Sequence, residues 1–320
     1  CLIMKHPLRR RWMYLGFLGL RAVARWLPLP VAQVFGRLLG YAAYALLGPY
    51  RALALIHLRQ AFGPALQEGT ARRIARGVFI NLGKNALEWC VVERYSLARI
   101  RRIVEIYGLT HLEQALSQGR GVIALSAHFG NWELLAMALR SMGFEGGVVA
   151  RPLRYPEYQE FLRRLRARKG IATYDRGAVR DVARGLRANH IIGMMPDQDM
   201  DSLEGVFVDF FDRPTYTPAG PAALSLLTGA PIVPCFVVRD GRKFRVMLEE
   251  PLTITRTDNR THDVLRLTQQ WSRVVESYLR RSPNHWVWMH RRWKTAPLTV
   301  PELEDSPASS PPEALMGVVR

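Results

Sequence analysis

Two side chains of the kind that move protons, His128 and Glu133, lie five positions apart in the middle of the chain. The apolar run 122–125 just before them predicts a buried strand. Residues 132–142 have the composition of a helix that ends before Gly143. In open α/β sheets, functional sites form beyond the carboxyl ends of strands, where helix N-termini also point. The position of the pair therefore favours chemistry.

The spacing limits how the two side chains meet. Residues five apart in a regular helix do not share a face, so His128 must lie in the connection and Glu133 in the first helical turn. Gly130 and Asn131 suit such a bend. A carboxylate bonded to one imidazole nitrogen leaves the other free to accept a proton. The spacing thus allows a catalytic His128–Glu133 pair; the alternative is a polar junction whose histidine only bonds backbone groups.

Two further polar residues lie near predicted strand ends. Asp197 follows the apolar run 190–195, which predicts another strand. It is a candidate for catalysis, for holding arginine side chains, or for a simple turn. Ser126 lies two residues before His128 and is expected to be structural.

Composition narrows the class of protein. The 320 residues are 48% hydrophobic, enough for a sizeable core, and the net charge of +18 implies an anionic partner such as an acidic membrane, a phosphorylated substrate or nucleic acid. The three cysteines are too few and too scattered for a disulfide framework or a metal site. A reducing cytosolic setting fits this usage, and no metal is expected.

The first 48 residues alternate apolar runs with arginines. Neither 12–20 nor 31–47 reaches the uncharged length of a confident transmembrane helix, and no cleavage site of a signal peptide follows. Both resemble interfacial amphipathic helices. We predict that residues 1–48 attach the protein to the cytoplasmic face of a membrane; a pair of buried core helices is the alternative.

A basic stretch follows the focal region. Residues 151–187 contain ten arginines and one lysine against four acids. Guanidinium groups grip phosphate through two parallel hydrogen bonds. No aromatic interleaving, zinc-finger spacing or nucleic-acid-binding motif accompanies them, so a phosphorylated lipid fits better than nucleic acid.

The remaining pattern predicts an open, mostly parallel α/β sheet with helices on both sides. Residues 51–116 read as helical, and a helix is expected from Thr217 as N-cap and Pro218 through Leu227. The expected domains are the segment 1–48, a catalytic domain 49–296 and a disordered tail 297–320. Further strands are expected at 147–150, 232–238 and 244–248, and a further helix at 263–280.

Seven motifs carry a resemblance to a known family. In chain order they begin at Ser126 (SAHFGNWE), Arg151 (RPL), Met195 (MPDQ), Gly205 (GVFVDFF), Thr217 (TPAGP), Gly229 (GAPIVP) and Trp288 (WMHRRWK). This set resembles the late acyltransferases of lipid A biosynthesis, the lauroyl and myristoyl transferases, within the lysophospholipid acyltransferase group. The resemblance covers about residues 10 to 296.

The resemblance implies transfer of a fatty acyl chain from acyl carrier protein, or from coenzyme A, to a hydroxyl of a Kdo-bearing lipid A precursor. The place would be the cytoplasmic face of the bacterial inner membrane, with no cofactor and no acyl-enzyme. Mycobacterial mannoside acyltransferases share the Asn-Trp-acid form, so acylation of a phosphatidylinositol mannoside or a lysophospholipid is the alternative activity; a lipid-binding module is the non-enzyme alternative. The implied site comprises His128 and Glu133 as catalytic residues, Arg151, Arg164 and Arg166 for the oxyanion or phosphate, and Asp197 and Asn131 in support.

Overall fold

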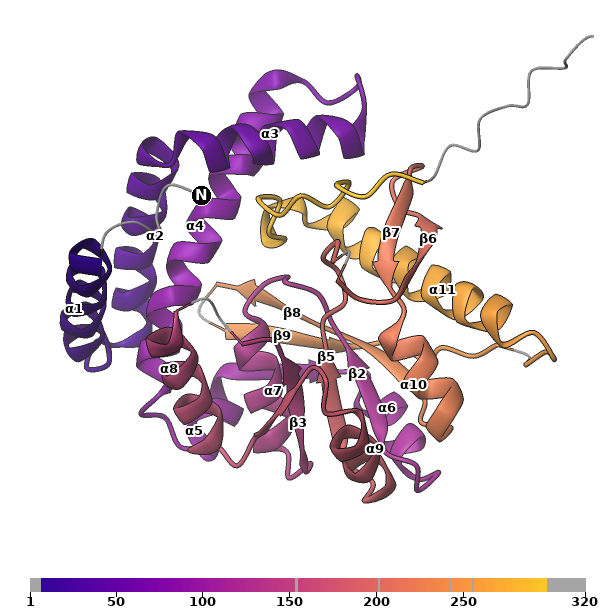
Figure 1. Ribbon diagram of the computed structural model, residues 1–320. Coiled ribbons are helices and arrows are strands. Elements are labelled where there is room, and N and C mark those ends of the chain that lie inside the picture. The colour runs from indigo at the N-terminus through magenta and orange to yellow at the C-terminus, as the bar shows by residue number, and fades with distance from the viewer. Residues whose placement is uncertain (1–6, 153–154, 201, 242, 255, 298–320) are drawn as a thin grey trace, which may run out of the picture.

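The computed structural model describes residues 7–152, 155–200, 202–241, 243–254 and 256–297, except for the side chains of 7–10 and 13. A seven-stranded sheet lies at its centre, with helices on both sides (Figure 1). The strands are β1 (Val104–Tyr107), β2 (Val122–Leu125), β3 (Gly146–Ala150), β4 (Ala172–Asp175), β5 (Ile191–Met194), β6 (Gly205–Asp209), β7 (Pro214–Pro218), β8 (Ile232–Asp240) and β9 (Lys243–Leu248). The helices are α1 (Pro7–Ala24), α2 (Leu29–Leu46), α3 (Gly48–Phe62), α4 (Glu68–Val92), α5 (Leu97–Ile103), α6 (Leu109–Leu116), α7 (Trp132–Ser141), α8 (Pro156–Ala167), α9 (Val179–Arg187), α10 (Gly220–Thr228) and α11 (Arg260–Arg281), with the 3₁₀ turn η2 (Pro283–His285).

The strand order is β1-β9-β8-β2-β5-β3-β4. Every pair in this sheet is parallel except the β8–β9 hairpin. The predicted open, mostly parallel α/β sheet is therefore confirmed. Such sheets are covered on both faces, which is why the central strands read as continuous apolar runs rather than as alternating ones.

Strand alternation divides the core into two layers. Val122 and Ala124 of β2 belong to a cluster with side chains from α5, α6, α7 and α8. Ile123 and Leu125 point the other way and pack with side chains from α9, α10 and α11. The focal strand is fully buried between these layers, so its carboxyl end is a rigid platform.

Two sequence predictions are corrected. The helix predicted to start at Thr217 and Pro218 begins at Gly220 instead, because both residues belong to β7, which pairs with β6 in a separate antiparallel hairpin. Residues 104–107, predicted as helical, form β1 beside β9. The predicted disordered tail lies almost wholly outside the described residues, since 298–320 are not among them.

The helix α2 packs along α4 through glycines, and both lie beside α1 in Figure 1. A Cβ added at Gly36 would lie 2.6 Å from the Cα of Lys84, and one added at Gly40 would lie 2.5 Å from the Cα of Ile80. Small side chains thus face the protein, whereas the large apolar ones face outward. Those exposed on α1 to α3 include Trp12, Leu15, Val34, Phe35, Leu38, Leu46 and Ile56.

Among the described residues, no single helix has the length and apolar character needed to cross a membrane. The pair α2 and α3, bent by 91° at the break between them, meets both criteria when taken together.

The Gly40 contact yields a stability prediction. Gly40→Leu forces a side chain against the α4 backbone, and we expect it to lower the free energy of unfolding by about 1–3 kcal/mol and to make α2 sensitive to protease. Thermal unfolding and limited proteolysis measure both effects. Gly19→Leu is the matched control, because nothing lies within 4 Å of a Cβ there; equal stability of the two variants would contradict the close α2–α4 contact.

Candidate active site

The register of two parallel strands brings the central residues together. Leu125 of β2 pairs with Met194 of β5. His128 lies three residues after the first and Asp197 three residues after the second. Both therefore leave the sheet at the same level of its carboxyl edge, the position at which open α/β sheets hold their sites.

Asp197 holds the imidazole of His128. Its Oδ1 lies 2.8 Å from Nδ1 of His128, while Oδ2 accepts the backbone N–H of His128 at 2.9 Å and Nε1–H of Trp286 at 2.7 Å. Since an ionised carboxylate only accepts, Nδ1 carries a proton. In the neutral ring Nε2 then has the lone pair, which is what a general base requires.

The charges of His128 and Asp197 shift the pKa values of the two groups in opposite directions. Burial opposes the charged form of His128, but the Asp197 carboxylate and the more distant Glu133 outweigh it and raise the pKa of His128 above its ordinary 6.5. Burial likewise opposes ionisation of Asp197, yet the charge of His128 and the hydrogen bonds from His128 and Trp286 lower the pKa of Asp197 to about 2. Asp197 is therefore ionised throughout the physiological range.

Glu133 has another partner. It lies in the first turn of α7, as predicted, but its carboxylate forms a two-pronged ion pair with Arg166, Nε–Oε2 at 2.9 Å and Nη2–Oε1 at 2.5 Å. Both side chains are almost fully buried. The expectation that Glu133 hydrogen-bonds the His128 ring is thus corrected: Asp197 does so, and Glu133 acts on His128 through its charge.

The structure separates the three predicted arginines. Arg166 and Arg151 line the same cavity as His128 and Glu133. Arg164 does not; it is exposed on the outer side of α8 and pairs with Glu160 at 2.5 Å. Positions two apart on a helix point to different sides, so α8 turns only one of its two candidates inward.

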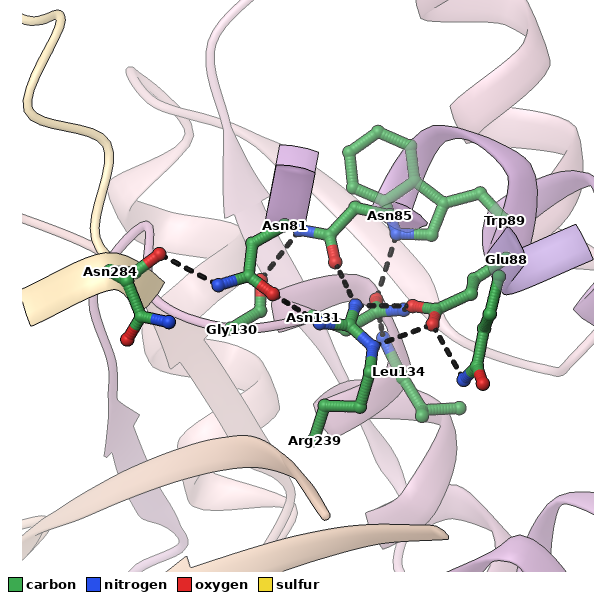
Figure 2. A network of polar contacts seen from close by, with 10 residues as sticks. Asn81, Asn85, Glu88, Trp89, Gly130, Asn131, Leu134, Arg239 and Asn284 are labelled. Carbon is green, nitrogen blue, oxygen red and sulfur yellow. Dashed lines mark hydrogen bonds and ion pairs between the residues drawn. The ribbon is translucent and has the colours of Figure 1, made fainter. Parts of the chain in front are cut away.

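Asn131 joins the site to the C-terminal part of α4 (Figure 2). As N-cap of α7 its Oδ1 accepts from the backbone N–H of Leu134, and its Nδ2 donates to Glu88 at 2.8 Å. Glu88 is fully buried and forms a bidentate ion pair with Arg239, at the far end of β8, with both contacts at 2.7 Å. Asn131 thus fixes the residue at which α7 begins, and with it the position of Glu133 in the first turn.

The turn between His128 and α7 requires a glycine. Gly130 has φ of +59°, and a Cβ there would lie 1.8 Å from the carbonyl oxygen of Val237. Its carbonyl accepts from Asn85 at 2.6 Å (Figure 2). The backbone of this turn also pairs with the C-terminal segment: the Gly130 N–H donates to the His285 carbonyl, and the Val287 N–H donates to the His128 carbonyl.

His128 opens onto a large cavity of about 1370 Å³. Trp132 packs edge-on against its ring at 5.3 Å. Glu133, Arg166 and Arg151 line the same space, so the predicted pair is neither separated nor walled off. Within the described part of the chain, no group of three or more potential metal ligands comes together.

One part of the cavity runs beneath α7, and we call it the α7 channel. One face of α7 lines it through residues three and four apart, Trp132, Leu135, Ala136, Leu139 and Arg140. Ala124, Val148 and Ile191, also in the lining, come from strands whose side chains share the core layer of α7. Arg140 lies at the helix end away from His128 and pairs with Glu145 at 3.0 Å. The channel is therefore apolar along its length, with a charged pair at its end.

A second part of the cavity lies on the opposite face of the sheet. Its lining includes Val182 of α9, Leu224 of α10 and Val264 of α11. Arg176 and Arg260 also line the cavity. His128 therefore faces a space with two apolar regions and several guanidinium groups.

Comparison with known proteins identifies the family. The family described as bacterial lipid A biosynthesis acyltransferase matches residues 4–295. The chain belongs to this family. It is therefore an acyltransferase of lipid A biosynthesis, and the family resemblance drawn from the seven motifs is confirmed.

Individual relatives agree over almost the whole length. The lauroyltransferase of lipid A biosynthesis from Escherichia coli is 28% identical over 92% of this chain and 95% of its own. The palmitoleoyltransferase of the same organism is 28% identical over 92% of this chain and 94% of its own. A phosphatidylinositol mannoside acyltransferase from Mycobacterium tuberculosis is 30% identical over 59% of each chain.

Sequence reasoning missed two parts of this candidate site. The first is the role of Asp197 as the partner of the His128 ring; the signal was a polar residue after the strand 190–195, but its use needed the order of strands. The second is the ion pair between Glu88 and Arg239. The sequence offered no signal for it, because no short-range pattern links a charged residue in a helix to one in a distant strand.

The geometry of Asp197 predicts the response to Asp197→Asn. An amide accepts at only one of its two atoms. If the amide oxygen accepts from Trp286 and from the His128 backbone, the amide NH₂ faces Nδ1. Because NH₂ only donates, Nδ1 must then accept, and the proton of the neutral ring moves to Nε2. We expect kcat to fall by about 10⁴, as for the same change in a serine protease triad, measured by steady-state acyl transfer.

The pH profile provides a second measurement on the same variant. In the wild type, kcat/KM falls as the pH drops through a pKa above 6.5, because protonated His128 cannot act as a base. Loss of the Asp197 charge removes the raising contribution, so the acid limb of the variant moves to lower pH. Asp181→Asn, on the surface of α9, is the control; an unshifted acid limb would contradict this assignment.

Proposed function

We propose that the protein transfers a fatty acyl chain from a thioester on acyl carrier protein to a hydroxyl of a phosphorylated glycolipid such as a Kdo-bearing lipid A precursor. The observation that carries the proposal is His128, held by Asp197 with Nε2 available, beside an apolar channel and several arginines. A base, an acyl-sized apolar space and phosphate-binding groups are the three requirements of this reaction.

The chemistry follows from the tautomer. Nε2 of His128 takes the proton of the acceptor hydroxyl as its oxygen attacks the thioester carbonyl carbon. The carbonyl electron pair moves to oxygen, then returns as the carbon–sulfur bond breaks, and the imidazolium gives its proton to the leaving thiolate. Asp197 stabilises the imidazolium through Nδ1, and Glu133 stabilises it through space while fixing Arg166 beside the oxyanion.

The charges in the cavity favour an anionic acceptor. Arg151 lines the cavity near His128, and its charge opposes protonation of the ring. Arg176 and Arg260 lie in the lining as well. We assign these groups to the phosphates of the glycolipid, and the apolar region beside α9 and α10 to one of its acyl chains.

The outward apolar face of α1 to α3 supports attachment to a membrane. Phe35, Leu38 and Leu46 are each more than half exposed, whereas the small residues of the same helix face α4. A helix on the surface of a soluble protein has the opposite arrangement, with its large apolar side chains turned toward the core. We propose that this face lies in the cytoplasmic leaflet of the bacterial inner membrane, where a lipid acceptor is available.

The proposed function is tested by reconstitution. Purified enzyme in detergent is incubated with acyl thioesters of acyl carrier protein or coenzyme A and with a Kdo-lipid A precursor, a phosphatidylinositol mannoside or a lysophospholipid. Mass spectrometry should show one added acyl chain on the lipid A precursor, and His128→Ala should abolish it while the circular dichroism spectrum stays unchanged. Transfer only to another acceptor, or full activity of His128→Ala, would refute the proposal.

The α7 channel predicts which residue limits acyl length. If the chain lies along α7, Arg140→Ala opens the end of the channel, and longer donors gain relative to the wild-type preference. Each additional buried methylene contributes about 0.8 kcal/mol, or about fourfold in relative kcat/KM. Competition between acyl thioesters of graded length measures the shift.

The matched control is Arg184→Ala. Arg184 forms an ion pair at 3.0 Å with Asp181, as Arg140 does with Glu145, but on the exposed side of α9 and outside the cavity lining. An unchanged length preference in Arg140→Ala would place the acyl chain elsewhere.

A further inference from the structure

Ser126 occupies the junction between β2 and His128. Its backbone N–H donates to Met194 at 2.9 Å, so the chain still follows the sheet at this point. Alternation along the strand puts its side chain on the same face as Ala124, the face covered by α7. Ser126 and Ala124 both line the cavity. The serine hydroxyl therefore lies at the end of the α7 channel nearest the base.

This hydroxyl is buried and has no partner. Ser126 is 4% exposed, and its Oγ makes no hydrogen bond to the described residues. Buried hydroxyls are almost always bonded, and an exception requires an explanation. An alanine would fill the same strand position without leaving a polar group unpaired, so folding does not account for a serine here.

Ser272 of α11 makes the contrast clear. Its Oγ is also buried without a partner, but a serine in a helix can rotate toward the carbonyl four residues earlier. It lies outside the cavity lining. The hydroxyl of Ser126 has no such carbonyl on its own strand, and the space it faces is the one that receives substrate.

We propose that Ser126 is a catalytic residue whose hydroxyl donates a hydrogen bond to the carbonyl oxygen of the acyl thioester. The inference rests on the proposed function: an acyl chain in the α7 channel has its carbonyl at the end where Ser126 lies. When the acceptor oxygen bonds to the carbonyl carbon, the displaced electron pair resides on the carbonyl oxygen, and the Ser126 O–H holds it. Ser126 keeps its proton throughout; the acceptor proton goes to His128 and then to the leaving thiolate.

The electrostatics favour a donor of this kind. Two N–H groups of Arg166 are already bonded to Glu133, so the charge of that guanidinium is largely balanced. The Ser126 hydroxyl has no competing acceptor, and no bond has to break before it turns to the substrate. The buried strand fixes the position of its oxygen, and a hydrogen bond donated in a water-poor site stabilises an oxyanion more than the same bond in water.

The test is Ser126→Ala in the full-length enzyme, assayed with an acyl thioester and the lipid acceptor. We expect kcat to fall on the order of 10²-fold with little change in KM, since the bond strengthens only in the transition state. The acid limb of the pH profile should stay in place, because His128 is untouched. The thermal midpoint should be unchanged or higher, because a buried unpaired hydroxyl is removed.

Ser272→Ala is the control, with the same stability effect expected and no loss of kcat. If Ser126→Ala does not fold, Ser126→Cys, with a weak S–H donor, takes its place and should also lose kcat. An unchanged kcat, or an acyl adduct on Ser126 by mass spectrometry, would overturn the proposal. Absence of transfer by the wild type would instead refute the proposed function, so the two failures are distinguishable.

Discussion

The carboxylate of Asp197 is the group on which the site depends. Its two oxygens accept from the His128 ring, the His128 backbone and the Trp286 indole, so three donors from two distant parts of the chain meet on one carboxylate. A buried carboxylate is costly unless its lone pairs are satisfied, and here three donors satisfy it. The same bonds that make its burial tolerable also fix the tautomer of His128, the proposed base.

A second buried charge pair determines the position of α7. Glu88 and Arg239 are both almost fully buried, and the network around them includes Asn81, Asn85 and Asn131. Buried ion pairs seldom add net stability compared with apolar residues of the same volume. What this pair provides is a fixed relation among α4, the end of β8 and the turn before α7, which sets where Glu133 and Arg166 meet.

The sequence predicted the parts of the site that are local in the chain. The strand before His128, the bend at Gly130 and the position of Glu133 in the first turn of α7 all follow from short-range pattern and backbone preference. The hydrogen-bond partner of the His128 imidazole does not follow from such local signals. Asp197 and Glu133 are both carboxylates that come shortly after a strand, and only the parallel pairing of β2 with β5 decides which of them reaches the ring.

The remaining errors have related causes. Thr217 and Pro218 have the chemistry of a helix start, but the pairing of β7 with β6 overrides that local preference. Arg164 and Arg166 are equivalent as residue types, and the rotation of α8 alone decides which one faces inward. Tertiary pairing and helix rotation are not properties of any short window of sequence.

The contact between the Trp286 indole and Asp197 has a consequence for how the protein is made. Residues 285–287 lie along the loop 128–130 and supply the last donor to the carboxylate. During synthesis the ribosome releases this segment only after the whole sheet has emerged. In a nascent chain still lacking it, only the two His128 donors remain for Asp197, so the imidazole gains its full support only when the last part of the chain has folded back.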